Sequence, residues 1–505
     1  MSTLTEFEAT GRRIERHDPW PRIVVPTAAW CAAIAGLERG ALTLLGLWGE
    51  PSAVHMALFD AAGGEVAVLS LDCPDGRFPS VAAHHLPADR LERTVRDLTG
   101  LEPDGARDDR PWLDHGRWPI AHPLGAATAQ PPGRPHAYDF LPAEGGSLHQ
   151  IPVGPVHAGI IEPGHFRFTA NGETVVRLEE RLGYVHKGVE KLMAGAHPSR
   201  AARLAGRLSG DSTVAGTLAF CRAVEAAWRI DVPVRATWLR ALMAELERLA
   251  NHFGDIGAIC NDASFAIMLA HCTVLRESVL RAAAACFGHR LMMDRVVPGG
   301  LAGDINPAGV AELRALCALA RRTFPGLIEL YDGTASLQDR TVGTGTVARA
   351  LVDRFGCGGY IGRASGRAFD ARRAFAYPPY DRLQLDVPTF DEGDVNARVW
   401  VRIREVEQSL GLVDQLLAGL PAGEVLAAAR SPGETCEGMA IIESFRGDVL
   451  AWVRLGADDA VMRCHMRDPS WFQWPLLEAA IEGNIVADFP LCNKSFNCSY
   501  SGHDL

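Results

Sequence analysis

The chain has 505 residues, of which 48% are hydrophobic, and it carries a formal net charge of -11. This length and apolar content suffice for a sizeable core spread over two or three domains. The acidic balance and the lack of any block rich in Lys or Arg argue against a nucleic-acid partner.

No apolar run in the sequence approaches the roughly 20 residues that cross a bilayer, and the charged N-terminus lacks the apolar core of a signal peptide. We therefore expect a soluble chain that reaches a membrane only through partner subunits. The twelve cysteines are scattered, and no two of them form a Cys-x-x-Cys pair. Buried, reduced thiols in a cytoplasmic protein explain this pattern.

The first segment, 1–102, predicts a small α/β domain. Apolar runs over 54–59 and 66–71 are typical of strands, and Gly63-Gly64 suits a hairpin turn between them. Helical spacing of apolar residues follows toward the end of the segment.

The second segment, 103–150, is rich in Pro, Gly, Asp and Arg and cannot form a packed core by itself. It is either a linker or an extended arm laid on another surface. Its aromatic residues Trp112, Trp118 and Tyr138 favour the docked arm, because exposed aromatic side chains gain from burial.

The third segment, 151–505, begins with a hairpin signal. Alternating apolar residues flank Asn171-Gly172, a pair that suits a type I′ turn. Beyond it, apolar residues repeat at helical spacing over 239–253 and 399–417, as in long helices packed in a bundle. The predicted fold class is therefore α+β and multidomain, with a small α/β domain, a Pro-rich arm and a mainly α-helical domain that has a β-hairpin near its start.

Several motifs follow one another in an order known from one protein family. They are Gly154-Pro-Val-His157, Glu162-Pro-Gly-His-Phe-Arg167, Tyr184-Val-His-Lys-Gly-Val-Glu190-Lys191, Glu245-Leu-Glu-Arg-Leu-Ala-Asn-His252 and Glu443-Ser-Phe-Arg446-Gly-Asp448. With them the chain resembles the large subunits of energy-converting hydrogenases of the formate hydrogenlyase type and the quinone-cavity subunit of respiratory complex I. The N-terminal region resembles the accessory subunit that docks beside this subunit, here fused ahead of it.

In the hydrogenase members of this family, two Cys-x-x-Cys pairs hold the metal. The matching positions here are Ser209, Ser212, Ser499 and Gly502. A nickel–iron centre needs soft thiolates, whereas serine offers a hard hydroxyl and glycine no side chain, so we expect no metal or other cofactor on this chain. Ser209 and Ser212 precede an apolar helix that starts near Val214, and we expect them to cap it.

A quinone site like that of complex I would use a tyrosine and a histidine. The tyrosine position is Gly210 here and the histidine position falls near Pro163, so His157 and His165 are the candidates to stand in. A purely structural histidine is the alternative for each. No dinucleotide fingerprint follows a strand, which argues against an NADH site on the chain itself.

The resemblance implies that Arg207 lies beside an iron–sulfur cluster held by a smaller partner subunit. A fixed guanidinium charge there would raise the reduction potential of the cluster. The alternative is a buried arginine paired with a carboxylate such as Asp211, which is itself a candidate for proton chemistry.

His186 and Glu190 are four residues apart and would share one face of a helix. They form either part of a proton path or a polar pair that fixes the helix. Glu245 and His252 can share a face of another helix, and buried acids and histidines on neighbouring helices are candidates for proton movement.

The leading hypothesis is a subunit of a membrane-associated redox or ion-translocating complex on the cytoplasmic side. It would pack on an iron–sulfur small subunit and on antiporter-like membrane subunits, and its cavity would hold a quinone, another electron carrier, or only protein and water. A non-catalytic scaffold is the alternative, followed by a quinone-reducing subunit or an active hydrogenase. A cavity lined by Arg207, His157 and Asp211 favours redox or proton chemistry, whereas one filled by Phe496 and Tyr500 favours the scaffold.

Overall fold

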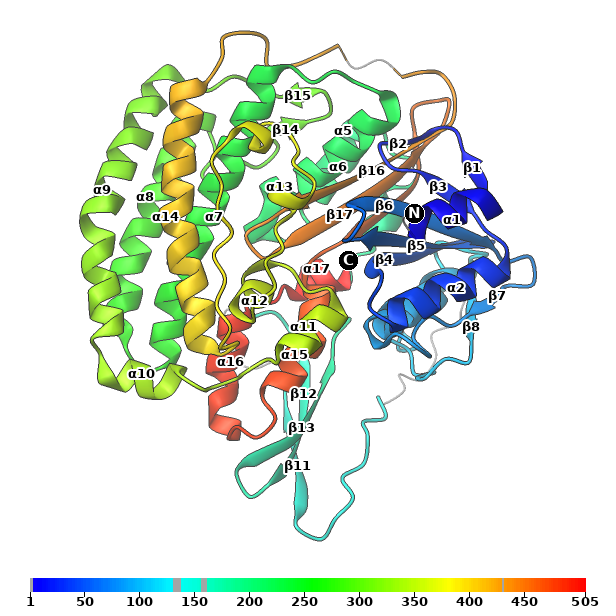
Figure 1. Ribbon diagram of the computed structural model, residues 1–505, viewed down its shortest axis with the longest axis horizontal. Coiled ribbons are helices and arrows are strands. Elements are labelled where there is room, and N and C mark those ends of the chain that lie inside the picture. Colours follow the sequence, from blue (N-terminus) through cyan, green and yellow to red (C-terminus); the bar gives the residue numbers. More distant parts are fainter. Residues whose placement is uncertain (1–2, 130–137, 156–160, 429–430) are drawn as a thin grey trace.

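The computed structural model describes residues 3–129, 138–155, 161–428 and 431–505. Helices and several sheets are mixed throughout them, and the predicted α+β, multidomain fold class is confirmed. In Figure 1 a helical bundle stands on the left, two sheets occupy the centre and the right, and a long hairpin projects at the bottom.

The N-terminal region is built on a sheet of five described strands in the order β1-β3-β6-β5-β4. These strands are β1 (Arg12–Ile14), β3 (Arg22–Val24), β4 (Thr43–Glu50), β5 (Ala53–Asp60) and β6 (Glu65–Asp72). The helices and short strands around them are α1 (Thr3–Thr10), α2 (Thr27–Glu38), α3 (Asp89–Thr99), β7 (Arg77–Pro79) and β8 (Glu102–Asp104). The predicted hairpin at Gly63-Gly64 is confirmed, since it joins the antiparallel strands β5 and β6.

The arm is docked on the body of the protein. Its short strands are β9 (Ile120–Ala121) and β10 (Thr128–Ala129). Trp112 is buried under the guanidinium groups of Arg90 and Arg93, each 4.6 Å from the centroid of its ring. Trp118 stacks on His186, with ring centroids 4.7 Å apart. These contacts support the docked arm over the free linker, while the bounds 102/103 and 150/151 stay a prediction.

A three-stranded sheet forms the projecting hairpin at the bottom of Figure 1. Its described strands are β11 (Leu148–Val153), β12 (His165–Asn171) and β13 (Thr174–Arg181). The hairpin itself is confirmed, but the type I′ turn is wrong. Asn171 pairs with Thr174, so the two loop residues are Gly172 and Glu173. Gly172 has a φ of 60°, but Glu173 does not have the positive φ that a type I′ turn requires at its second loop position. A positive φ at the first loop position alone is typical of a type II′ turn.

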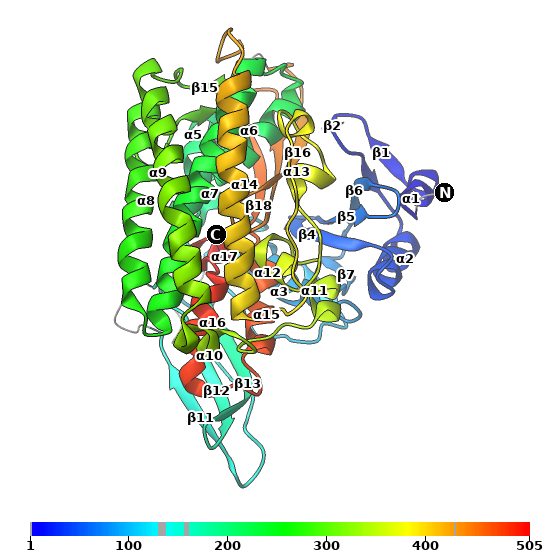
Figure 2. The same ribbon diagram turned by 60° about the vertical axis from the view of Figure 1, so that its left-hand side comes forward.

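Long helices make up the bundle on the left of Figure 1, and Figure 2 shows the same helices from another side. They are α7 (Val234–Asp262), α8 (Ala266–Phe287), α9 (Pro307–Asp332) and α14 (Val395–Gly419). Two of them contain the predicted runs 239–253 and 399–417, whose apolar side chains are buried. The helical periodicity in those runs is therefore confirmed.

A second sheet lies between the bundle and the N-terminal region. Its four described strands have the order β18-β17-β16-β2 and are β2 (His17–Asp18), β16 (Cys436–Glu443), β17 (Asp448–Leu455) and β18 (Val461–Arg467). Helix α6 (Thr213–Trp228) packs against β16 and β17. The N-terminal sheet also packs against these two strands, through Trp48 of β4 and Trp452 of β17, whose rings are 5.4 Å apart. Because β2 comes from the N-terminal region, the two regions share backbone hydrogen bonds.

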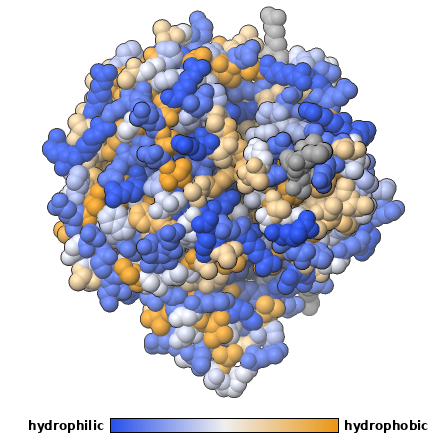
Figure 3. Space-filling view, in the orientation of Figure 1, coloured by the Kyte–Doolittle hydropathy of each residue, from blue (hydrophilic) through white to orange (hydrophobic). Residues whose placement is uncertain are grey.

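Shorter helices connect these layers. They are α4 (Val189–Met193), α5 (Pro198–Ala205), α10 (Ala335–Thr341), α11 (Arg349–Phe355), α12 (Gly359–Ala364), α13 (Ala371–Ala374), α15 (Ser470–Ala480), α16 (Phe489–Phe496) and α17 (Tyr500–Asp504). Among the described helices, none combines the length and the apolar character needed to cross a bilayer. The face in Figure 3 is mostly polar, with apolar side chains scattered over it.

Candidate functional site

Ser209 and Ser499 bring two distant parts of the chain together at the centre of the molecule. Ser209 precedes the 3-10 turn η2 (Gly210–Ser212), and Ser499 precedes α17, which lies near the middle of Figure 1. Both serines are buried, and their hydroxyl oxygens are 2.9 Å apart. The two segments that the family resemblance points to therefore meet at one place.

Asp211 and Arg446 complete this hydrogen-bonded group. The Ser209 hydroxyl donates to Asp211 Oδ1 at 2.7 Å, and Arg446 Nη1 donates to the same oxygen at 2.9 Å. Arg446 Nε also donates to the carbonyl oxygen of Asn497 at 2.6 Å, so one guanidinium joins both segments. Desolvation raises the pKa of Asp211, but the charge of Arg446 and the hydrogen bonds outweigh it, and the pKa lies below its ordinary value. Asp211 is thus held as a carboxylate.

Gly502 leaves no room for a side chain. A Cβ atom built on it would lie 2.6 Å from Asp468 Oδ2 and 2.9 Å from Ser499 Oγ. Its N–H donates to Ser499 Oγ at 2.9 Å, so Ser499 caps the helix that follows it. A larger side chain at position 502 would therefore displace Asp468 or Ser499.

These residues do not fit a nickel–iron centre. Such a centre needs thiolates, but the serine hydroxyls are hard donors that already bond one another and a carboxylate. Cys498 and Cys492 are near in sequence, yet burial raises the pKa of Cys498 well above its ordinary value and that of Cys492 to about 12, so both stay thiols. Among the residues that the structure describes, no group of three or more His, Cys, Asp or Glu side chains could hold a metal ion.

Ser212 lies at the N-cap position of α6, as predicted, whereas Ser209 lies at the N-cap position of η2. Neither serine side chain accepts a hydrogen bond from the helix. Instead, Glu247 of α7 accepts from the N–H groups of Val214 and Ala215 at 2.7 and 3.1 Å. Burial raises the pKa of Glu247 to about 8 despite these hydrogen bonds. A cap supplied by another helix leaves no local sequence signal, which is why the sequence pointed to the serines.

Arg207 is not paired with Asp211. Its side chain is 41% exposed, and its Nη2 donates to Asp294 Oδ2 at 2.8 Å. The buried-pair alternative is therefore wrong, because Arg446 occupies the carboxylate of Asp211. Arg207 instead forms a partly exposed ion pair with Asp294 at the surface.

His186 and Glu190 do not share a helix face, because α4 begins only at Val189. His186 Nδ1 lies 2.6 Å from the carbonyl oxygen of Asp504. Glu190 is buried, with one oxygen 2.6 Å from Arg463 Nη1 and the other 2.9 Å from His465 Nδ1. Burial raises the pKa of Glu190, but the opposite effect of Arg463 and His465 is larger, and the pKa lies at about 2. Glu190 is therefore ionised at physiological pH and bonds two residues of β18.

His165 lies on β12 with its ring centroid 4.6 Å from that of Phe140. Burial and the nearby charges of Arg167 and Arg181 lower its pKa to about 4, so the ring is neutral at physiological pH. His157 lies outside the described residues. Gly210, at the tyrosine position of a complex I-like site, has open space where a Cβ atom would lie.

Glu245 and His252 belong to a larger buried charge cluster between α7, α14 and β16. Its members are Glu245, Arg248, His252, Arg363, Asp370, Arg372, Glu405 and Glu443. His252 Nε2 lies 2.7 Å from Glu405 Oε2. Four carboxylates face three guanidinium groups, so one proton balances the charge. Burial and the charge of Asp370 raise the pKa of Glu443 to about 7, which makes this side chain a place for that proton.

Comparison with known proteins agrees with this geometry. The family described as the respiratory-chain NADH dehydrogenase 49 Kd subunit matches residues 262–437. Formate hydrogenlyase subunit 5 of Escherichia coli is 30% identical over 445 residues, which cover 86% of this chain and 78% of that protein. An NADH-quinone oxidoreductase subunit of Dehalococcoides mccartyi is 30% identical over 343 residues, 66% of this chain and 92% of that protein.

A solved structure is similar as well. It is that of the membrane-bound sulfane sulfur reductase, an archaeal respiratory membrane complex, one chain of which superposes with a TM-score of 0.66 at 25% identity. The match covers 71% of this chain and 99% of that one. The fold and the relatives together identify the class of this protein as a large subunit of the hydrogenase and complex I type. The chain belongs to the family that joins hydrogenase large subunits such as formate hydrogenlyase subunit 5 to the 49 kDa-type subunit of NADH dehydrogenase.

Proposed function

We propose that the chain is the large subunit of a membrane-associated redox complex and that it works without a nickel–iron centre of its own. The observation that carries this proposal is the bond between Ser209 and Ser499, with Asp211 and Arg446 beside it, at the place where hydrogenases use thiolates. Hydroxyl groups that bond one another, and a carboxylate bound by arginine, leave no soft donor for nickel.

In this function the chain packs on an iron–sulfur small subunit and, on the cytoplasmic side, on antiporter-like membrane subunits. The surface position of Arg207 supports the first contact, because Asp294 holds its guanidinium where a partner can reach it. A positive charge at that interface would raise the reduction potential of a nearby cluster. A soluble quinone is the acceptor to test first, since relatives include NADH-quinone oxidoreductase subunits.

The test is purification of the intact complex through a tag on this chain. Mass spectrometry would identify the partners, and elemental analysis would measure nickel and iron per chain. We expect iron from the partner subunit and no nickel, with a nickel–iron hydrogenase purified in parallel as the positive control. Stoichiometric nickel would overturn the proposal.

A non-catalytic scaffold is the second candidate, and a specific observation favours it. Phe496 and Tyr500 are both buried, with Phe496 packed under Arg398 at 4.6 Å and Tyr500 against Trp474 at 4.7 Å. Aromatic side chains thus occupy the core around Ser499.

The Asp211→Asn variant distinguishes the redox subunit from the scaffold. If the chain is a scaffold, the rate at which a quinone analogue reoxidises the dithionite-reduced complex is unchanged per assembled complex. If the site takes part in electron or proton transfer, that rate falls.

A further inference from the structure

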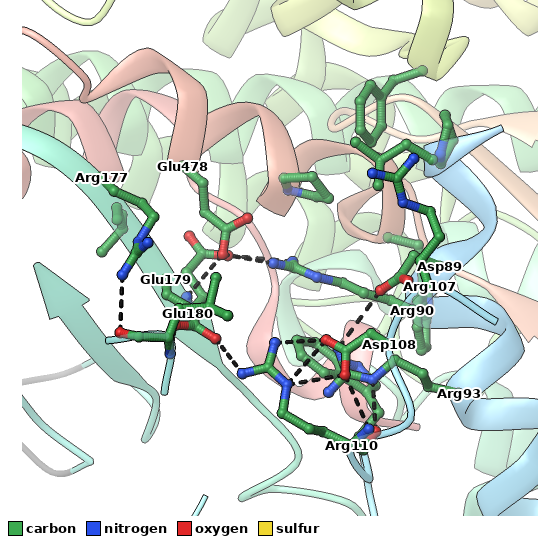
Figure 4. A pocket seen from close by; sticks show the side chains of 18 of the residues that line it. Asp89, Arg90, Arg93, Arg107, Asp108, Arg110, Arg177, Glu179, Glu180 and Glu478 are labelled. Carbon is green, nitrogen blue, oxygen red and sulfur yellow. Dashed lines mark hydrogen bonds and ion pairs between the residues drawn. The ribbon is translucent and has the colours of Figure 1, made fainter. Parts of the chain in front are cut away.

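A cavity of about 410 Å³ lies where the N-terminal region meets the rest of the protein. Its walls come from α3, the start of the arm, β13 and α15, and Figure 4 shows that most of the labelled side chains around it are charged. It is separate from the bond between Ser209 and Ser499.

Glu180 and Glu478 share a single arginine in this cavity. Arg90 of α3 lies 2.8 Å from Glu478 Oε1 through Nη2, and 3.3 Å from Glu180 Oε2 through Nη1. The backbone N–H of Glu180 also donates to Glu478 Oε1, at 2.8 Å, which brings the second carboxyl group close to the first. Figure 4 shows Arg90 reaching from α3 to Glu478, beside Glu180.

Three buried polar atoms on the lining residues have no hydrogen-bond partner. They are Glu180 Oε1, Trp112 Nε1 and Trp471 Nε1. The three side chains are at most 2% exposed, and all three line the cavity. An unpartnered buried polar atom is costly. These three atoms are shielded from solvent, whereas the side chain of Glu478 is 23% exposed, so water in the cavity reaches the pair through Glu478.

The charges around Glu180 do not balance if both carboxyl groups are ionised. The guanidinium group of Arg110 donates to Glu179 at 2.6 Å, so it brings no spare positive charge to this pair. On the other side, Cys498 and Tyr500 are neutral, since burial raises the pKa of both. Arg90 alone therefore faces two carboxyl groups, which leaves one negative charge without a partner.

We propose that Glu180 and Glu478 bind one proton between them and exchange it with water in the cavity. The step is a simple protonation in which a carboxylate takes a proton from water and no electron moves. A metal ion fits less well, because it needs several oxygen ligands and Glu180 offers one unpartnered oxygen. The direction of the pKa shift agrees with this. Burial, then the charge of Glu478, raises the pKa of Glu180 well above its ordinary value against the opposite effect of Arg90.

The charge of this proton-binding pair also acts on the candidate site. Glu180 lies within electrostatic range of Cys498 and Tyr500, which flank Ser499. A change in its charge therefore alters the field at the segment that bonds to Ser209. The proposal stands whether the chain is a redox subunit or a scaffold.

The test is infrared spectroscopy of the full-length chain at pH 7, comparing the carbonyl band of protonated carboxylic acids among variants. Glu180→Gln should remove one carboxylic acid per chain from this band. Glu478→Gln should also remove one, because Glu180 then pairs with Arg90 alone and ionises. The double variant should remove one and no more, since one proton is shared.

Glu173→Gln, at the exposed turn of the same hairpin, is the matched control and should leave the band unchanged. Circular dichroism verifies that each variant folds, and two independent single variants keep the test decisive if one does not. An unchanged band in a folded single variant would overturn the proposal. A loss of two carboxylic acids in the double variant would show that Glu180 and Glu478 each bind a proton of their own and do not share one.

Discussion

The hydroxyl oxygens of Ser209 and Ser499 lie 2.9 Å apart although 290 positions separate the two residues. This bond joins the segment before α6 to the C-terminal segment, and Asp211 and Arg446 extend it. The segments can therefore fold together through hydrogen bonds alone.

Ser209→Ala should destabilise the protein by about 1–3 kcal/mol, because Ser499 and Asp211 each lose a partner in a buried or partly buried setting. Urea unfolding at pH 7 measures the loss. Ser278→Ala is the control, since that exposed hydroxyl bonds a carbonyl of its own helix, and its free energy of unfolding should change little. Equal effects for the two variants would show that the bond between the serines contributes nothing.

Gly502→Ala should destabilise by about 1–3 kcal/mol, because the added Cβ atom meets Asp468 Oδ2 at 2.6 Å. Gly210→Ala is the matched control, since its Cβ atom would meet nothing within 4 Å. Thermal unfolding of both variants compares them directly. A Gly502→Ala protein as stable as the control would mean that the site can open to accept a side chain.

Glu247 should make the stability depend on pH. Its pKa is about 8 in the folded protein and about 4.3 in an unfolded chain, so the folded state binds more protons between these values. Stability should therefore fall as pH rises through this window and level off above it. In Glu247→Gln this fall should be smaller than in the wild type in urea titrations between pH 5 and 9, with the contributions of other raised carboxyl groups such as Glu443 left in place.

Glu329→Gln, on the exposed face of α9, is the control for this pH dependence and should keep the wild-type profile. A Glu247→Gln protein with the same slope as the wild type would assign the fall to another group, such as Glu443.

Arg207→Gln should change the free energy of unfolding by less than about 1 kcal/mol, because its ion pair with Asp294 is exposed. In the intact complex it should lower the reduction potential of the partner's iron–sulfur cluster, measured by a redox titration followed by electron paramagnetic resonance. Arg281→Gln removes a more exposed, ion-paired charge from α8 and should leave that potential unchanged. The same potential in both variants would remove Arg207 from the proposed interface.

Elements with a local signature could be predicted from the sequence. The apolar repeats in 239–253 and 399–417 lie on one face of α7 and α14, because a helix returns to the same face every three or four residues. Prediction from local sequence failed at two places. His186 lies before the start of α4 at Val189, so it does not share a helix face with Glu190. At the start of α6, the backbone N–H groups donate to Glu247 of another helix and not to a serine side chain.

The sequence by itself determined the family and the α+β class, and it gave the prediction that Ser209, Ser212, Ser499 and Gly502 stand where hydrogenases have thiol ligands. Only the tertiary structure decided what those residues do. Residue type and spacing are carried by the chain itself, whereas a partner such as Asp294 for Arg207, or Glu478 for Glu180, depends on which elements pack together. Hydrogen bonds and charge pairs act over a few ångströms, so their partners follow from the fold and not from distance along the chain.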